Sequence, residues 1–205
     1  MPAIVENPQE EKKQKVVSKR KTVDKWKKKK WFTVFAPEAF DRKELCETVS
    51  EKPELLVNRT VSVNAGDLTK QMKLNHIFLR FKVDNVQAQK AYTQIVGHEI
   101  KDSYLRKFVR RRSNKVMTVQ DIQTSDGKKV HIKAVAITGK RASKPKETAI
   151  RKLMAEEIAK ANGKKDFNQL VQELIFGNTA SRIFKAISKV AAIKRVEITK
   201  SALIK

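Results

Sequence analysis

Residues 117–138 read MTVQDIQTSDGKKVHIKAVAIT and carry the strongest hairpin signal of the chain. Asp126-Gly127 lies between two runs rich in apolar residues, and this dipeptide favours a tight turn because glycine readily adopts a positive φ. The apolar members of the two runs are Met117, Val119, Ile122, Val130, Ile132, Val135 and Ile137. The stretch therefore predicts two antiparallel strands joined by a short turn.

Upstream of this hairpin the pattern is also mostly that of strands. Ile77, Leu79, Phe81 and Val83 alternate with other side chains, which is typical of a half-buried strand. Further strand candidates are residues 55–57, 60–63 and 92–100. Residues 38–50 are expected to hold a short helical turn, and residues 102–110 one inserted helix, since Tyr104, Leu105, Phe108 and Val109 share a helix face. Five or six strands with hairpin connections predict an antiparallel sheet curled into a barrel or sandwich.

Downstream of residue 140 the apolar spacing becomes helical. Three apolar stripes lie within residues 150–158, 167–175 and 183–190, and Val196 with Ile198 predicts a closing strand. The predicted fold is α+β, with a mostly antiparallel, β-barrel-like central domain and flanking and C-terminal helices. The predicted parts are a basic N-terminal tail that is disordered when free, the central domain and a helical part packed on the barrel, at residues 1–30, 31–140 and 141–205.

The charge balance points to a polyanionic partner. The chain has 205 residues, with 46 Lys and Arg against 22 Asp and Glu, and a net charge of +24. Such an excess causes self-repulsion in the free protein, and it lies in separate blocks rather than on one amphipathic membrane helix. No apolar run is long enough to cross a bilayer, no secretory signal is recognisable, and a single cysteine fits a reducing compartment. Nucleic acid is therefore the expected partner, and a membrane is not.

No pattern in the sequence indicates catalysis. The three histidines are not spaced as metal ligands, and the six glycines form no phosphate-binding loop. Glu156 and Glu157 are adjacent and point to different helix faces, and no nearby residue activates Cys46. We therefore predict that the chain is not an enzyme and has no cofactor, no metal and no small-molecule substrate.

Fifteen residues are candidates for RNA binding because they belong to basic clusters. The lysines between Trp26 and Trp31 can neutralise phosphates, and Trp26 can stack on a base. Trp31 and Phe32 are instead expected to begin the core. Arginine side chains suit bidentate phosphate contacts, and a basic loop with Gly and Pro can lie along a phosphate backbone. The candidates are Trp26, Lys27, Lys28, Lys29, Lys30, Arg110, Arg111, Arg112, Lys115, Lys140, Arg141, Lys144, Lys146, Arg151 and Lys152.

Several segments together resemble one known family. Residues 30–40 (KWFTVFAPEAF), 61–63, 81–83, 124–127, 136–141 and 150–154 are similar, in their order and spacing, to the archaeal and eukaryotic small-subunit ribosomal protein family S-three-a. The similarity covers roughly residues 25–200, and because the long C-terminal extension of eukaryotic members is not seen, an archaeal member is expected. The resemblance implies a β-barrel-like centre with flanking helices and a non-enzymatic, structural role on the platform of the small subunit, near the messenger exit region.

The expected function is therefore that of a structural constituent of the small ribosomal subunit in the cytoplasm. The expected partners are small-subunit ribosomal RNA, neighbouring small-subunit proteins and messenger RNA near the exit. Two alternatives stay open at this point. One is a basic, non-ribosomal architectural protein that binds RNA or DNA, and the other, for which no residue pattern speaks, is an RNA-processing enzyme or its basic subunit.

Overall fold

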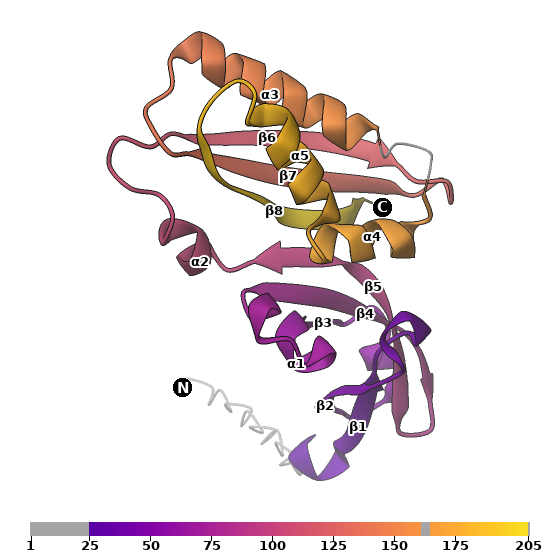
Figure 1. Ribbon diagram of the computed structural model, residues 1–205. Helices are drawn as coiled ribbons and strands as arrows, with labels where there is room; N and C mark the ends of the chain where they lie inside the picture. The colour runs from indigo at the N-terminus through magenta and orange to yellow at the C-terminus, as the bar shows by residue number, and fades with distance from the viewer. Residues whose placement is uncertain (1–24, 161–164, 205) are drawn as a thin grey trace, which may run out of the picture.

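The computed structural model describes residues 25–160 and 165–204 (Figure 1). Eight strands form one mixed sheet, and their bounds are β1 Lys30–Phe35, β2 Glu44–Ser50, β3 Thr60–Asn64, β4 Ile77–Gln87, β5 Lys90–Ile100, β6 Lys115–Gln123, β7 Lys129–Thr138 and β8 Ile193–Ile204. The α-helices are α1 Ala65–Thr69, α2 Asp102–Arg106, α3 Lys144–Ala159, α4 Phe167–Ile175 and α5 Asn178–Ile187. Short 3-10 helices are η1 Lys25–Lys28, η2 Glu38–Phe40, η3 Pro53–Leu56 and η4 Met72–Leu74.

Strand β5 organises the sheet because it pairs with three other strands. Along one side it pairs antiparallel with β4, which in turn pairs with β3. On the other side its first residues run parallel to β1, with Val34 opposite Ala91, and its last residues run antiparallel to β8, with His98 opposite Ser201. The strand order is β2-β1-β5-β8-β7-β6, with β4 and β3 attached to the free side of β5.

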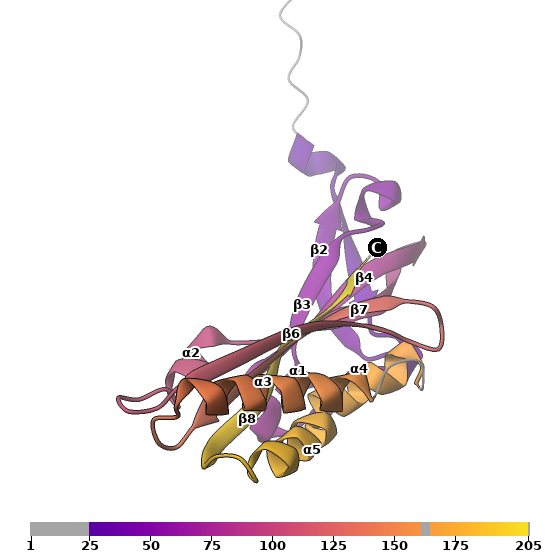
Figure 2. The same cartoon turned by 90° about the horizontal axis from the view of Figure 1, so that it is seen from above.

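The sheet is open, and the predicted barrel is wrong. Strand β8, predicted to close the sheet, lies inside it between β5 and β7. Within the described residues β2, β3 and β6 each have a single partner strand, so three sheet edges remain. The long β5 divides one side between β1 and β8, and the two parts of the sheet diverge from it (Figure 2). No two of these three edges pair with each other in the described residues, so the sheet does not close into a barrel.

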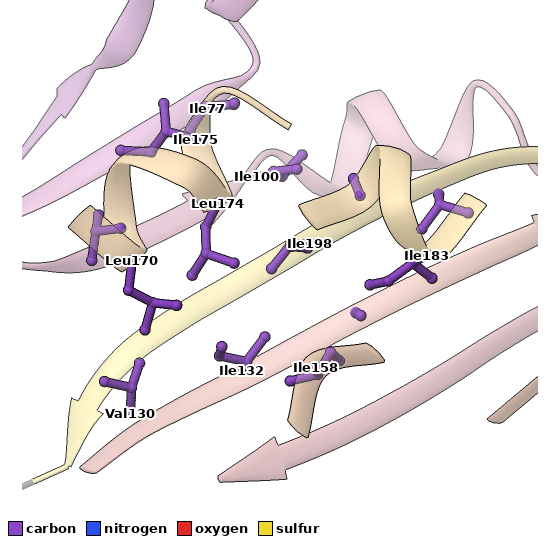
Figure 3. Close-up of a cluster of buried hydrophobic side chains, with 14 of the residues drawn as sticks. Ile77, Ile100, Val130, Ile132, Ile158, Leu170, Leu174, Ile175, Ile183 and Ile198 are labelled. Atoms are coloured by element: carbon purple, nitrogen blue, oxygen red, sulfur yellow. The ribbon is translucent and has the colours of Figure 1, made fainter. Parts of the chain in front are cut away.

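The main core lies between one face of the sheet and the three C-terminal helices. In Figures 1 and 2, α3, α4 and α5 lie on the same side of β6, β7 and β8. Figure 3 shows Ile132 and Ile198 of the sheet near Ile158, Leu170 and Ile183 of the helices, and all five side chains are buried. Full burial of one such side chain stabilises a fold by about 1.5–3 kcal/mol. The apolar stripes of the last third therefore cover a sheet face instead of a barrel wall.

A second, smaller core lies under β1. Its buried members are Phe32, Val34, Leu56, Val83 and Ala91. Phe32 thus begins a core as expected, but Trp31 is 63% exposed, so the expectation for this side chain is wrong. The reason is the alternation of a strand, in which neighbouring side chains point to opposite faces.

Three local predictions also differ from the structure. Residues 44–50 form strand β2, which pairs with β1, instead of part of a helical turn. Residues 55 and 56 belong to η3 and not to a strand. The inserted helix is only five residues long and ends at Arg106, and α1 is a second helix within the central part. In the first case, pairing with a strand distant from the turn overrides the local apolar spacing.

Candidate nucleic-acid interface

Three connecting segments meet at one end of the sheet. They are residues 107–114 between α2 and β6, residues 139–143 between β7 and α3, and residues 188–192 between α5 and β8. All three lie on the left of Figure 1, at the same end of β6, β7 and β8. We call this region the three-loop end.

Backbone hydrogen bonds hold the three segments together. The N–H of Thr138 donates to the carbonyl oxygen of Asn114 at 3.0 Å, and the N–H of Asn114 donates to Oγ1 of Thr138 at 2.8 Å. The side-chain oxygen of Asn114 also accepts from the N–H of Ala142 at 3.2 Å. The N–H of Gly139 donates to the carbonyl oxygen of Ala192 at 2.8 Å, which adds the third segment. The loops are therefore fixed relative to one another by hydrogen bonds of their backbone and of the Asn114 and Thr138 side chains.

Most cations predicted for this region are exposed, and no carboxylate within the described residues pairs with them. The arginine triplet, Arg110–Arg112, lies in the first loop, and Arg112 adopts a left-handed backbone with a φ of 66°. Ser113 closes the turn, since its hydroxyl donates to the carbonyl oxygen of Arg110 at 2.6 Å. Five further predicted residues in or near this region are exposed, and no ion pair is found for them in the described part of the chain. They are Lys115, Lys140, Arg141, Lys146 and Lys152.

Two predicted residues differ from the rest because they contact an internal carboxylate. Glu147 of α3 is buried, and its Oε2 lies 3.6 Å from Nζ of Lys144 and 3.5 Å from Nη2 of Arg151. The side-chain amide of Asn114 also donates to this carboxylate. Glu147 therefore joins the start of α3 to the loop of the arginine triplet, and it partly neutralises Lys144 and Arg151.

The lysine run at residues 27–30 lies elsewhere. It belongs to η1 and the start of β1, which Figures 1 and 2 both show away from the three-loop end. Nζ of Lys29 lies 3.8 Å from the ring centroid of Trp26, a cation–π contact, and Trp26 is 68% exposed. Exposed Trp31 extends this group. The predicted tail before residue 25 lies outside the described residues.

Sequence reasoning missed a pair of lysines on the sheet face that α3–α5 leave uncovered. Lys133 on β7 lies directly opposite Lys200 on β8. Lys200 also lies opposite Glu99, but that carboxylate forms an ion pair with Arg80. Like charges directly opposite each other destabilise a sheet, which a bound polyanion would relieve. The alternation in β7 could have placed Lys133 on this face, but the partner strand could not be deduced locally.

His98 and Cys46 are both poorly suited to catalysis. His98 is buried, and burial lowers its pKa to about 4, so it is neutral at physiological pH. Burial raises the pKa of the Cys46 thiol, which disfavours the nucleophilic thiolate. In residues 25–160 and 165–204, no cluster of three or more His, Cys, Asp or Glu side chains could hold a metal ion. Within the same residues, no helix has the length and apolar character needed to cross a membrane.

Comparison with known proteins decides the family. A family model described as the Ribosomal S3Ae family matches residues 17–205. The chain belongs to the Ribosomal S3Ae family. The predicted membership is thereby confirmed, and as a member of a ribosomal protein family the chain is a structural protein and not an enzyme.

Relatives in the Ribosomal S3Ae family match over most of their length. "Small ribosomal subunit protein eS1" of Methanoculleus marisnigri is 36% identical over 178 residues, which are 87% of this chain and 90% of the relative. The protein of the same name in Sulfurisphaera tokodaii is 34% identical over 188 residues, covering 92% and 97% of the two chains. Both organisms are archaea, in agreement with the expected archaeal branch of the family.

Proposed function

We propose that this chain is a structural component of the small ribosomal subunit in the cytoplasm and that its three-loop end binds small-subunit ribosomal RNA. The observation that carries the proposal is the group of exposed cations that the loops at residues 107–114 and 139–143, with the adjoining starts of β6 and α3, bring to one end of the sheet. Most of these cations form no ion pair within the described part of the chain. Their number and spread suit a phosphate backbone, since such contacts supply affinity that depends on salt and does not read sequence. The printed name of the relatives, small ribosomal subunit protein eS1, supports the assignment to the small subunit.

The finer part of the proposal concerns the position in the subunit. The family resemblance supports a place on the platform near the messenger exit region, with messenger RNA and neighbouring small-subunit proteins as further partners. Exposed Met117 and Val119 on the edge strand β6 support a protein neighbour, because apolar side chains on a sheet edge favour contact with another chain. Cross-linking of the assembled subunit, followed by identification of the linked RNA and protein segments, tests this position.

The proposed RNA contact is tested by a salt titration. The full-length protein is bound to transcribed small-subunit ribosomal RNA at increasing salt, and the same is done for a variant with Arg110, Arg111 and Arg112 changed to Ala. We expect a steep loss of wild-type affinity with salt. In the variant, the slope should be smaller by roughly 0.7–0.9 for each phosphate that is no longer neutralised. A wild-type affinity that does not change with salt contradicts the proposal.

A matched variant controls for net charge. Lys128, Lys129 and Lys160 lie at the opposite end of β6, β7 and α3 and are also exposed, although Lys128 contacts the ring of Phe167 and Lys160 forms an ion pair with Glu157. Changing these three lysines to Ala removes the same charge, and we expect a smaller effect than for the arginine triplet. Equal effects would mean that net charge alone governs binding. A preference for duplex DNA over ribosomal RNA in competition would favour the architectural DNA-binding alternative instead.

A further inference from the structure

A cavity of about 570 Å³ lies between the corner of α4 and α5 and the beginning of β8. Gly177 has a φ of 77° and turns the chain from one helix into the next. The aromatic side chains of Phe176, at this corner, and Phe184, on α5, both line the cavity, and they are 51% and 39% exposed. The volume lies within the roughly 300–1,000 Å³ that is usual for pockets that bind small organic groups.

Basic side chains also line the cavity. Lys185, Lys194 and Arg195 line it together with a single carboxylate, Glu197. Nε of Arg195 donates to Glu197 at 2.7 Å, so this carboxylate is already neutralised. Lys185 and Lys194 are exposed, and within the described chain no acidic side chain forms an ion pair with either. The cavity therefore combines two aromatic rings with an excess of positive charge.

The basic wall is continuous with the three-loop end. Nζ of Lys194 donates to the carbonyl oxygen of Phe108 at 3.3 Å, and Nη2 of Arg195 donates to the hydroxyl of Tyr104 at 3.0 Å. The guanidinium of Arg195 also lies 5.6 Å from the ring centroid of Phe108. Phe108 precedes the arginine triplet by two residues. An RNA strand whose phosphates contact the arginine triplet can therefore extend toward the cavity.

We propose that this cavity binds one unpaired nucleotide of ribosomal RNA, with its base against Phe176 and Phe184 and its phosphate beside Lys185 and Lys194. Every base offers a flat π face for stacking on an aromatic side chain, and its phosphate meets the positive charge. The inference rests on the proposed function, because it assumes that RNA lies along the neighbouring loops. It adds a site that takes a base in addition to sites that take phosphates.

The test compares two single-stranded oligonucleotides of equal length and charge. One is oligouridine, and the other has the same backbone without bases. Both are bound to the full-length wild type and to Phe176→Ala and Phe184→Ala variants at one salt concentration. We expect the wild type to prefer the strand with bases and each variant to lose about fivefold to hundredfold of its affinity for that strand alone, as stacking on one aromatic ring predicts.

Two further variants separate the possible outcomes. Met72→Ala removes an exposed apolar side chain on η4, away from the cavity, and serves as the matched control. The arginine-triplet variant reports on phosphate contacts and weakens both strands equally. If only the triplet variant weakens binding, the cavity proposal is wrong and the proposed function stands. If no variant weakens binding, both fail.

A second readout uses the assembled ribosomal subunit. Ribosomal RNA that contains 4-thiouridine is irradiated, and the cross-linked peptides are identified by mass spectrometry. We expect cross-links at the peptides of Phe176 or Phe184. Cross-links at the peptide of the arginine triplet and none at the peptides of Phe176 and Phe184 would overturn the proposal.

Discussion

Asp126, in the turn between β6 and β7, caps helix α4 through Phe167. The backbone N–H of Phe167 donates to Oδ2 of Asp126 at 3.1 Å, across 41 residues of sequence. Asp166 occupies the N-cap position of α4, yet its side chain makes no capping bond and accepts from the hydroxyl of Ser125 instead. One turn therefore reverses the chain between β6 and β7 and also supplies a hydrogen-bond acceptor for an N–H at the start of α4.

Changing Asp126 to Ala should destabilise the protein by about 1 kcal/mol, because an N–H at the start of α4 loses its acceptor. Asp126→Asn keeps an oxygen for this bond and also suits the turn before Gly127, so it should stay within a few tenths of a kcal/mol of the wild type. Urea unfolding of the three proteins measures the difference. Equal midpoints for Ala and Asn would show that the cap contributes nothing.

Replacing Gly97 by Ala should be much more damaging. A Cβ at this position would lie 2.0 Å from the carbonyl oxygen of Ser201, so β5 and β8 could not keep their spacing. We expect a loss of more than about 2 kcal/mol in unfolding free energy, since strain falls on backbone in the middle of the sheet. Gly139→Ala is the control, because its Cβ would meet only an atom at 3.6 Å. Thermal unfolding that shifts equally for both variants would contradict this account.

His98 should make stability depend on pH between about 4 and 6.5. Nε2 of His98 lies 2.9 Å from the carbonyl oxygen of Ile198 and therefore donates to it, while Nδ1 accepts from the hydroxyl of Ser201 at 2.7 Å. This network holds the neutral ring, and burial lowers its pKa from 6.5 to about 4. The unfolded chain therefore binds a proton at pH values where the folded chain does not, and acid favours unfolding.

The expected loss is on the order of 3 kcal/mol as the pH falls from 6.5 to 4, and none of this loss is present above pH 6.5. In His98→Gln the absolute stability should be lower at pH 7, but the slope with pH in this window should be smaller. Urea unfolding at several pH values gives both slopes. Parallel pH profiles of the two proteins would exclude His98 as the cause.

Lys133→Glu should separate stability from RNA binding. The new carboxylate would lie opposite Lys200 and replace a repulsive pair by an attractive one, which stabilises the free protein by roughly 0.2–1 kcal/mol. Binding to ribosomal RNA should weaken, because the uncovered sheet face loses positive charge. Lys133→Gln should show about half of each effect. Unfolding and salt-dependent binding measured on the same samples test both parts, and unchanged RNA affinity would remove this face from the interface.

The local sequence was sufficient for features that depend on neighbouring residues. The Asp126-Gly127 hairpin follows from the conformational freedom of glycine, and the apolar stripes of α3, α4 and α5 follow from helical periodicity. The arginine triplet and the loop at Lys140 and Arg141 were recognised as basic clusters because charge is visible in any sequence. The excess of Lys and Arg over Asp and Glu by itself also indicates a polyanionic partner.

Other features required the tertiary structure. The sequence shows that β5 is a strand, but it does not show that β1, β4 and β8 all pair with it or that the edge strands β2, β3 and β6 stay apart in the described residues. Neither the opposition of Lys133 and Lys200 nor the cavity between Phe176, Phe184 and the start of β8 can be read from local patterns. Periodicity and charge are properties of residues a few positions apart. Strand partners, helix caps supplied by a distant turn, and cavities depend instead on which distant segments lower the free energy by packing together.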